Sequence, residues 1–100
     1  MNYIDDIAFL IYCKTVPKNA VIDISQEDWR LYRIYAVLCL AKGVETQNID
    51  VHDAWSAWRS DTNPEHVSCI PFDDLPSRTQ EMDIEYRDAI RQVSKEQGEF

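Results

Sequence analysis

The sequence lacks any apolar run that approaches the roughly twenty residues needed to cross a bilayer. Its first dozen residues carry Asp5 and Asp6, where a secretory signal peptide has a basic start and a small-residue cleavage site. We therefore expect a chain that has no membrane partner and is not exported. The predicted location is cytoplasmic.

Cysteine is scarce, and its spacing argues against two of its common uses. Cys13, Cys39 and Cys69 are odd in number, and they show neither CxxC spacing nor a nearby pair of histidines. A disulfide framework and a zinc site are therefore not indicated. We predict three reduced thiols in or near the core, and neither a metal nor another cofactor.

Positive charge is also in short supply, with 10 Lys and Arg against 18 Asp and Glu and a net charge of -8. Proteins bind a phosphate backbone by neutralising it with Lys and Arg, so direct nucleic-acid binding is disfavoured. A small anionic ligand could still be held by one local cluster of arginines. The opposite interpretation is an acidic nucleic-acid mimic that occupies a basic groove on a protein, although many soluble domains are acidic merely for solubility.

The sequence is rich enough in apolar side chains to build one core. Of its 100 residues, 45% are hydrophobic and 11% are aromatic, which suits a single ordinary domain over residues 1–100. Helical spacing predicts a first amphipathic helix over 3–13, followed by a loop over 14–25. A second helix should follow a cap at Ser25 and end at Gly43. It is apolar on almost every side, which predicts the central packing element.

A third helix is expected from a cap at Thr46 to about Ser60, where Asn63-Pro64 enforces a stop. Residues 66–72 contain Pro71 and predict an extended strap, with Cys69 and Ile70 packed inward. Asp73 or Asp74 would cap a last helix with Pro76 in an early position. Its apolar stripe comprises Met82, Tyr86, Ala89, Ile90 and Val93. It should end near Glu96 and leave a frayed tail over 97–100. The predicted fold is an all-α bundle of about four helices with an extended, proline-containing strap before the last one.

The third helix carries the candidate site. At 100° per residue its buried stripe comprises Val51, Ala54 and Trp58. Trp55 lies beside that stripe, and Arg59 and His52 lie at the next edge. In one interpretation, Trp55 is at the rim of the core with Arg59 stacked over it as a cation–π pair. In the other, Trp55 is a platform for a planar ring, and Arg59 meets a phosphate.

Catalysis and metal binding find little support in the sequence. His52 and His66 could form an acid–base pair with a carboxylate, and His52 and Cys69 a thiol–base pair. A metal site on His52, His66 and Asp73 lacks any recognised ligand spacing. No motif surrounds these residues, so we predict a protein that is not an enzyme.

Residues 51–93 resemble the ryanodine-receptor (RyR) domain. The resemblance lies in His52-x-x-Trp55-x-x-x-Arg59 and in His66-x-x-x-Ile70-Pro71-Phe72-Asp73-Asp74-Leu75-Pro76, followed by Asp83 and Ala89-Ile90. The chain is also similar to small uncharacterised actinobacterial and phage proteins with a HxAWxAW helix and a VPFDEL strap. Two features depart from the RyR pattern: only residues 60–65 stand in place of a longer insert, and Val67 replaces a proline.

The resemblance implies a non-enzymatic domain that binds an adenine nucleotide or a cyclic ADP-ribose-like signal. Carried over, Trp55 would stack on the base and Arg59 would meet a phosphate. The strap would be held around the site by His52, His66, Phe72 and Asp73. Because tandem repeats bind a nucleotide between two repeats, a single domain would form the equivalent site as a homodimer.

Three functions remain open from the sequence. The first is sensing or sequestering a nucleotide-like ligand, for which a phage anti-defence sponge is one use. The second is an acidic interaction or inhibitor domain that binds a basic protein surface. The third is a structural domain with neither activity.

Overall fold

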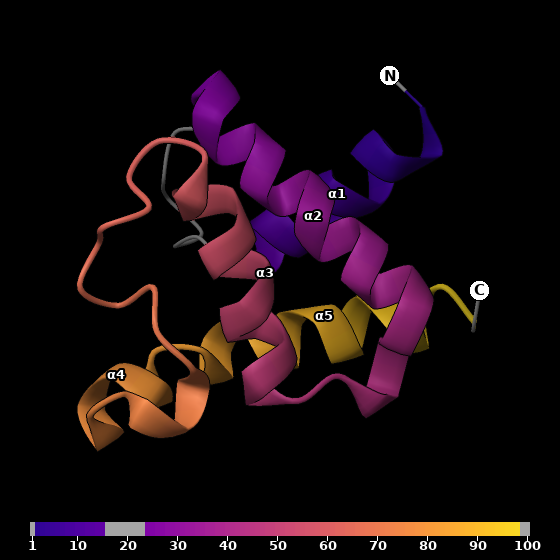
Figure 1. Ribbon diagram of the computed structural model, residues 1–100. Helices are drawn as coiled ribbons and strands as arrows, with labels where there is room; N and C mark the ends of the chain where they lie inside the picture. The colour runs from indigo at the N-terminus through magenta and orange to yellow at the C-terminus, as the bar shows by residue number, and fades with distance from the viewer. Residues whose placement is uncertain (1, 16–23, 99–100) are drawn as a thin grey trace.

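The computed structural model describes residues 2–15 and 24–98, which fold into helices joined by turns and loops (Figure 1). The elements are α1 (Tyr3–Thr15), α2 (Gln26–Lys42), η1 (Gly43–Glu45), α3 (Asn48–Ser60), η2 (Phe72–Asp74), α4 (Ser77–Glu81) and α5 (Ile84–Glu96). Within these two ranges there is no β-strand, which confirms the predicted all-α bundle. Among the helices described, none is both long and apolar enough to cross a membrane.

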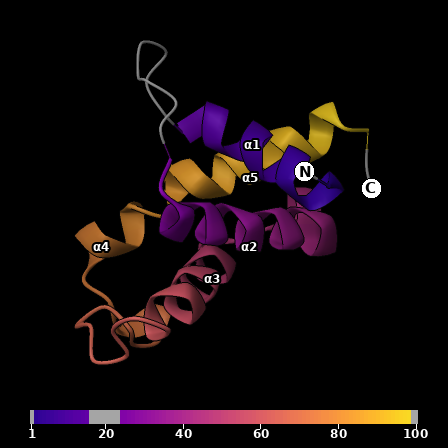
Figure 2. The same cartoon turned by 90° about the horizontal axis from the view of Figure 1, so that it is seen from above.

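Helix α2 lies at the centre of the bundle, as its sequence predicts. It contacts α1, α3 and α5, and Figure 2 shows it between the α1–α5 pair on one side and α3 on the other. Its start follows the predicted rule, because the Ser25 hydroxyl accepts a hydrogen bond from the Asp28 amide at 3.1 Å. Its end also agrees, since Gly43 follows Lys42 with a positive φ of 53°.

Aromatic rings fill much of the core between α1, α2 and α5. Tyr12, Tyr32 and Tyr35 are buried and meet edge to face, with ring centroids 5.3 and 5.8 Å apart. Edge-to-face contacts of this kind add roughly 0.5–1.5 kcal/mol per pair beyond the burial of area. Ile90 and Val93 of α5 pack into the same core, so α5 is fixed against α2.

The predicted cap at Thr46 is wrong. Helix α3 begins one residue later than that cap implies, after Gln47, whose amide donates to the Asp50 carboxylate at 2.8 Å. Thr46 is instead fully buried, and its hydroxyl donates to the Gly43 carbonyl at 2.7 Å. Its own carbonyl accepts from Arg91 of α5, so this threonine joins η1 to α5.

The predicted single last helix is also wrong, because it is divided into α4 and α5. Met82 and Asp83 form the turn between them, and Met82 is 67% exposed instead of buried. Both residues keep near-helical backbone angles, with φ of -64° and -82°. A change of direction that leaves the local backbone nearly helical does not disturb the 3.6-residue pattern, so the sequence could not reveal it.

The strap over residues 66–72 is folded instead of extended. Its first residues form a turn in which the Cys69 amide donates to the His66 carbonyl at 2.9 Å. Ile70 is 39% exposed, contrary to the predicted inward packing, and Cys69 is only partly buried. Leu75, just beyond the strap, supplies the buried apolar anchor.

Two predictions concern segments near the ends of helices. Lys14 and Thr15 extend α1 beyond its predicted end, and Lys14 pairs with Glu96 of α5 at 2.9 Å. The rest of the expected loop, residues 16–23, lies outside the described residues. Helix α5 ends at Glu96 as predicted, and residues 99–100 of the expected tail also lie outside the described part of the chain.

Candidate functional site

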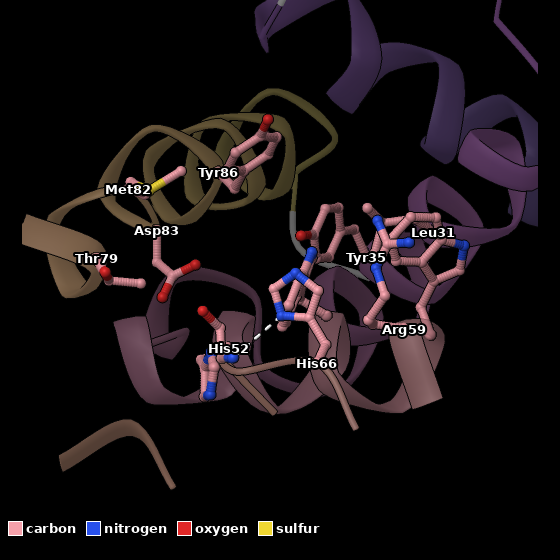
Figure 3. Close-up of a pocket in the computed structure, with 12 residues that line it drawn as sticks. Leu31, Tyr35, His52, Arg59, His66, Thr79, Met82, Asp83 and Tyr86 are labelled. Atoms are coloured by element: carbon pink, nitrogen blue, oxygen red, sulfur yellow. Dashed lines mark hydrogen bonds between the residues drawn. The ribbon is translucent and has the colours of Figure 1, made fainter. Parts of the chain in front are cut away.

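A cavity of about 410 Å³ opens where α2, α3, the strap and the start of α5 meet (Figure 3). Small-molecule sites in proteins begin at about 300 Å³, so the cavity falls within their usual size. Aromatic, imidazole and hydroxyl side chains dominate its lining. The lining residues are Leu31, Tyr35, His52, Trp55, Trp58, Arg59, His66, Ser68, Thr79, Met82, Asp83 and Tyr86.

Helix α3 presents two adjacent stripes, as its spacing predicts. Val51 is fully buried, and Trp58 is 7% exposed with its indole N–H donating to the Glu27 carbonyl of α2 at 2.8 Å. These residues fix α3 against α2. His52, Trp55 and Arg59 lie three and four residues apart along the neighbouring stripe and therefore line the cavity together.

His52 is more buried than the sequence predicts, with only 3% of its surface exposed. Its Nε2 lies 2.7 Å from the Ile70 carbonyl, and since that oxygen only accepts, Nε2 carries a hydrogen and donates. The ring also stacks on Trp55, with the ring centroids 5.9 Å apart, and its centroid is 6.1 Å from that of Phe72. His52 therefore joins the strap to α3, and these contacts bury the ring that the sequence places at an edge of the helix.

His66 covers the cavity from the strap. Its Nδ1 accepts a hydrogen bond from the Ser68 amide at 3.0 Å, so in the neutral ring the proton resides on Nε2. The imidazole meets Trp55 edge to face at 5.2 Å. Figure 3 shows the ring between Asp83 on one side of the cavity and Arg59 on the other. His66 thus offers one N–H donor to a molecule in the cavity.

The Arg59 guanidinium contacts the Trp55 ring, as the sequence suggests, but it lies closer to the Trp58 ring. Its central carbon is 4.4 Å from the Trp58 ring centroid and 5.9 Å from that of Trp55. Arg59 lies closer to Trp58 because the rings of His52 and His66 pack against the Trp55 ring. The Arg59 Nε is buried, and no described residue accepts a hydrogen bond from it.

Asp83 contributes the cavity's carboxyl group, and reasoning from the residues alone gave it no role in the site. Figure 3 shows its side chain directed into the cavity beside Thr79. No described residue forms a hydrogen bond or ion pair with this carboxyl. Its burial raises its pKa to about 6, although the nearby His52 acts in the opposite direction. The break between α4 and α5 places this side chain, so the helical pattern could not locate it.

The six residues predicted to form the site separate into three groups. His52, Trp55, Arg59 and His66 line the cavity. Phe72 contacts His52 but is not among the lining residues, and Asp73 is exposed on η2 and also lies outside the lining. In η2, Phe72 thus faces His52, whereas its neighbour Asp73 faces solvent and lies outside the cavity.

Two tyrosines complete the aromatic lining, and the sequence suggested them only as core residues. Tyr35 of α2 and Tyr86 of α5 have ring centroids 5.6 Å apart. Burial raises the pKa of both phenols, so both are neutral near pH 7. Among residues 2–15 and 24–98, no group of three or more potential ligands could hold a metal ion.

Comparison with known proteins corrects the resemblance drawn from the sequence. No curated protein and no solved structure matches the chain significantly. A family model does match, over residues 2–95, and it is not the RyR domain model. The predicted RyR relationship is therefore wrong, and the likeness to small actinobacterial and phage proteins gains no support. Because the match covers almost the whole sequence, the chain belongs to the family described as "Domain of unknown function (DUF7701)".

Proposed function

We propose that this protein is a non-enzymatic binding module that holds a nucleotide or a nucleotide-derived signalling molecule in the cavity beside α3. The observation that carries the proposal is a cavity with an aromatic lining and two charged groups on opposite sides, Arg59 and Asp83 (Figure 3). A nucleotide has the matching parts, a planar base with hydrogen-bonding edges and a negatively charged phosphate.

The aromatic lining supports binding of a planar ring. Trp55, Tyr35 and Tyr86 enter the cavity from three different helices, and Leu31 adds an apolar contact from α2. Stacking a base on an aromatic side chain stabilises binding by roughly 1–3 kcal/mol and tolerates different bases. A simple organic cation would also favour aromatic rings, but it would share the cavity with the positive charge of Arg59.

Arg59 supports binding of an anion. Ion pairs between described residues engage Lys14, Arg33, Lys42 and Arg87, and none engages Arg59. Its guanidinium is held by the Trp58 ring, which fixes its position without neutralising its charge. A planar guanidinium of this kind suits a phosphate, to which it donates two parallel hydrogen bonds.

The cavity supports binding better than catalysis. His52 Nε2 donates to the strap carbonyl, and His66 Nδ1 accepts from the strap amide, so each imidazole has one nitrogen engaged in holding the fold. The lining contains no cysteine that these rings could activate. The biological use that follows from binding without reaction is sensing or sequestering the ligand.

A thermal-shift panel of adenine, guanine and cyclic nucleotides tests the proposal. We expect at least one nucleotide to raise the melting temperature in a saturable manner, because a ligand that binds only the folded state stabilises it. Arg59→Ala should abolish that rise. Arg30→Ala is the matched control, since Arg30 is exposed on α2 and does not line this cavity.

Two outcomes would contradict the proposal. A panel in which no nucleotide stabilises the native protein would remove its basis. A rise that persists in Arg59→Ala would place the anion elsewhere. In the first case the acidic interaction domain becomes the better hypothesis, and its own signature is salt-sensitive capture of a basic protein.

A further inference from the structure

We infer that Asp83 recognises the Watson–Crick edge of guanine, so that the ligand of this cavity is a guanine nucleotide. The inference rests on the proposed function, because it names the base that the nucleotide site selects. It goes beyond that function, since stacking on the aromatic lining and pairing with Arg59 do not distinguish one base from another.

Asp83 has the position that base recognition needs. It lies in the turn between α4 and α5, and its carboxyl enters the cavity on the side opposite Arg59 (Figure 3). No described residue donates a hydrogen bond to either of its oxygens. A partly buried carboxyl without donors is costly to the folded protein, and a ligand that supplies donors removes that cost.

The hydrogen-bonding pattern of an ionised carboxylate selects among the bases. Its two oxygens only accept, so it pairs best with an edge that presents two neighbouring donors. Guanine presents its N1–H and its exocyclic amine side by side. Adenine and cytosine each place a ring-nitrogen acceptor next to the amine, and this acceptor would face a carboxylate oxygen without a hydrogen between them. Uracil and thymine offer a single N–H between two carbonyls.

The neighbours of Asp83 complement the remaining acceptors of guanine. His66 lines the cavity and carries a hydrogen on Nε2, because its Nδ1 already accepts from the Ser68 amide. The Thr79 and Ser68 hydroxyls also line this part of the molecule and act as donors where a carbonyl faces them. The guanine O6 and N7 need such donors. The site therefore offers acceptors and donors in the combination that guanine requires.

The two charged groups also fix the direction of the ligand. With the base edge at Asp83, the sugar and phosphate extend across the cavity toward Arg59 on its other side. Reversing the ligand would bring the phosphate against the Asp83 carboxylate, which is repulsive. A cavity of about 410 Å³ lies within the range of small-molecule sites and has room for a nucleotide base.

Calorimetric titration of the native protein with 5′-GMP, 5′-IMP, 5′-AMP and 5′-XMP at about pH 7.5 tests this inference. We expect GMP to bind at least tenfold more tightly than AMP, the factor that corresponds to about 1.4 kcal/mol. IMP should fall between them, because hypoxanthine keeps the N1–H but lacks the amine. Asp83→Asn should weaken GMP binding at least tenfold and favour XMP, because an amide pairs with the N1–H and C2 carbonyl of xanthine.

Asp53→Asn is the matched control, because Asp53 is exposed on α3 and is not a lining residue. It should bind each nucleotide as the native protein does. Equal affinity for all bases, with binding lost in Arg59→Ala, would overturn the guanine assignment and leave the nucleotide site intact. GMP binding unchanged in Asp83→Asn would overturn it equally. Absence of binding by every nucleotide would overturn both the assignment and the proposed function.

Discussion

Asp83 and Arg59 are charged side chains that the fold holds in a cavity, and neither has an ion-pair partner among the described residues. The Arg59 charge rests against the Trp58 ring, while burial shifts the Asp83 carboxyl toward its neutral form. Groups with perturbed pKa values tend to gather at functional sites. At the scale of single residues, burying Asp83 and Arg59 without ion-pair partners among the described residues therefore lowers the stability of the folded protein, and a ligand that pairs with them would raise it again.

The raised pKa of Asp83 predicts how stability depends on pH. The folded state holds this proton to about pH 6, whereas the unfolded chain releases it near the ordinary pKa of 3.8. The neutral carboxyl thus favours folding most at low pH, and its contribution is lost as the pH rises through about 6. Asp83→Asn should therefore raise the free energy of unfolding at pH 7.5 by roughly 1–2 kcal/mol, allowing for solvent in the cavity.

Urea unfolding at about pH 4 and pH 7.5 measures this effect. Near pH 4 the aspartic acid is largely protonated, so the native protein and Asp83→Asn should differ little. Asp53→Asn, an exposed site on α3, should show no comparable gain at either pH. A loss of stability in Asp83→Asn at pH 7.5 would mean that the carboxylate is stabilised in the folded protein.

Among the residues that line the cavity, the sequence singled out those of α3 but not Asp83. Helical phase alone distinguishes the buried Trp58 from the cavity stripe of His52, Trp55 and Arg59, because both stripes belong to one regular helix. Asp83 reaches the cavity through a turn that a 3.6-residue pattern does not register. The rings that pack against Trp55 come from the strap as well as from α3, and a local pattern contains no information on the strap contact.

Among the elements, η1 sets how closely α2 and α5 approach each other. Gly43 has a positive φ of 53°, and a Cβ built there would lie 2.7 Å from the Ser94 hydroxyl of α5. Both the backbone conformation and the contact favour glycine. Thr46 reinforces this junction, because its hydroxyl bonds to the Gly43 carbonyl and its carbonyl accepts from Arg91.

Gly43→Ala should therefore lower the free energy of unfolding by roughly 1–3 kcal/mol, as measured by urea denaturation. Gly98→Ala is the matched control, because Gly98 has a φ of 72° but no atom within 4 Å of a built Cβ. It should cost less, since it bears only the backbone strain. Equal losses in the two variants would show that the approach of α5 to η1 is not tight.

Element boundaries were predictable where a local signal sets them. Ser25 and Gly43 define the ends of α2 through a side-chain cap and a left-handed residue. The cap predicted at Thr46 was wrong because its hydroxyl donates to the Gly43 carbonyl of η1 and does not accept from an amide of α3. A sequence shows that threonine is able to cap a helix, but the choice between the two partners depends on how α5 packs.

At the scale of the whole molecule, the net charge of -8 opposes the binding of any anion from a distance. The cavity offsets this only locally, through Arg59 and the N–H groups that line it. A negative net charge disfavours long nucleic acids, whose many phosphates would be repelled by it. A single nucleotide has to approach only one arginine, which fits a cavity of this size.

Nucleotide binding in the cavity is tested most directly by an NMR titration that follows the three tryptophan indole N–H signals as a nucleotide monophosphate is added. Trp55 lines the cavity, whereas the Trp29 indole is bonded to Asp5 at 3.0 Å and does not line it. We expect a saturable shift of the Trp55 signal, with Trp29 unchanged and the response lost in Arg59→Ala. Spectra that do not change with any nucleotide, or that change equally at Trp29, would contradict it.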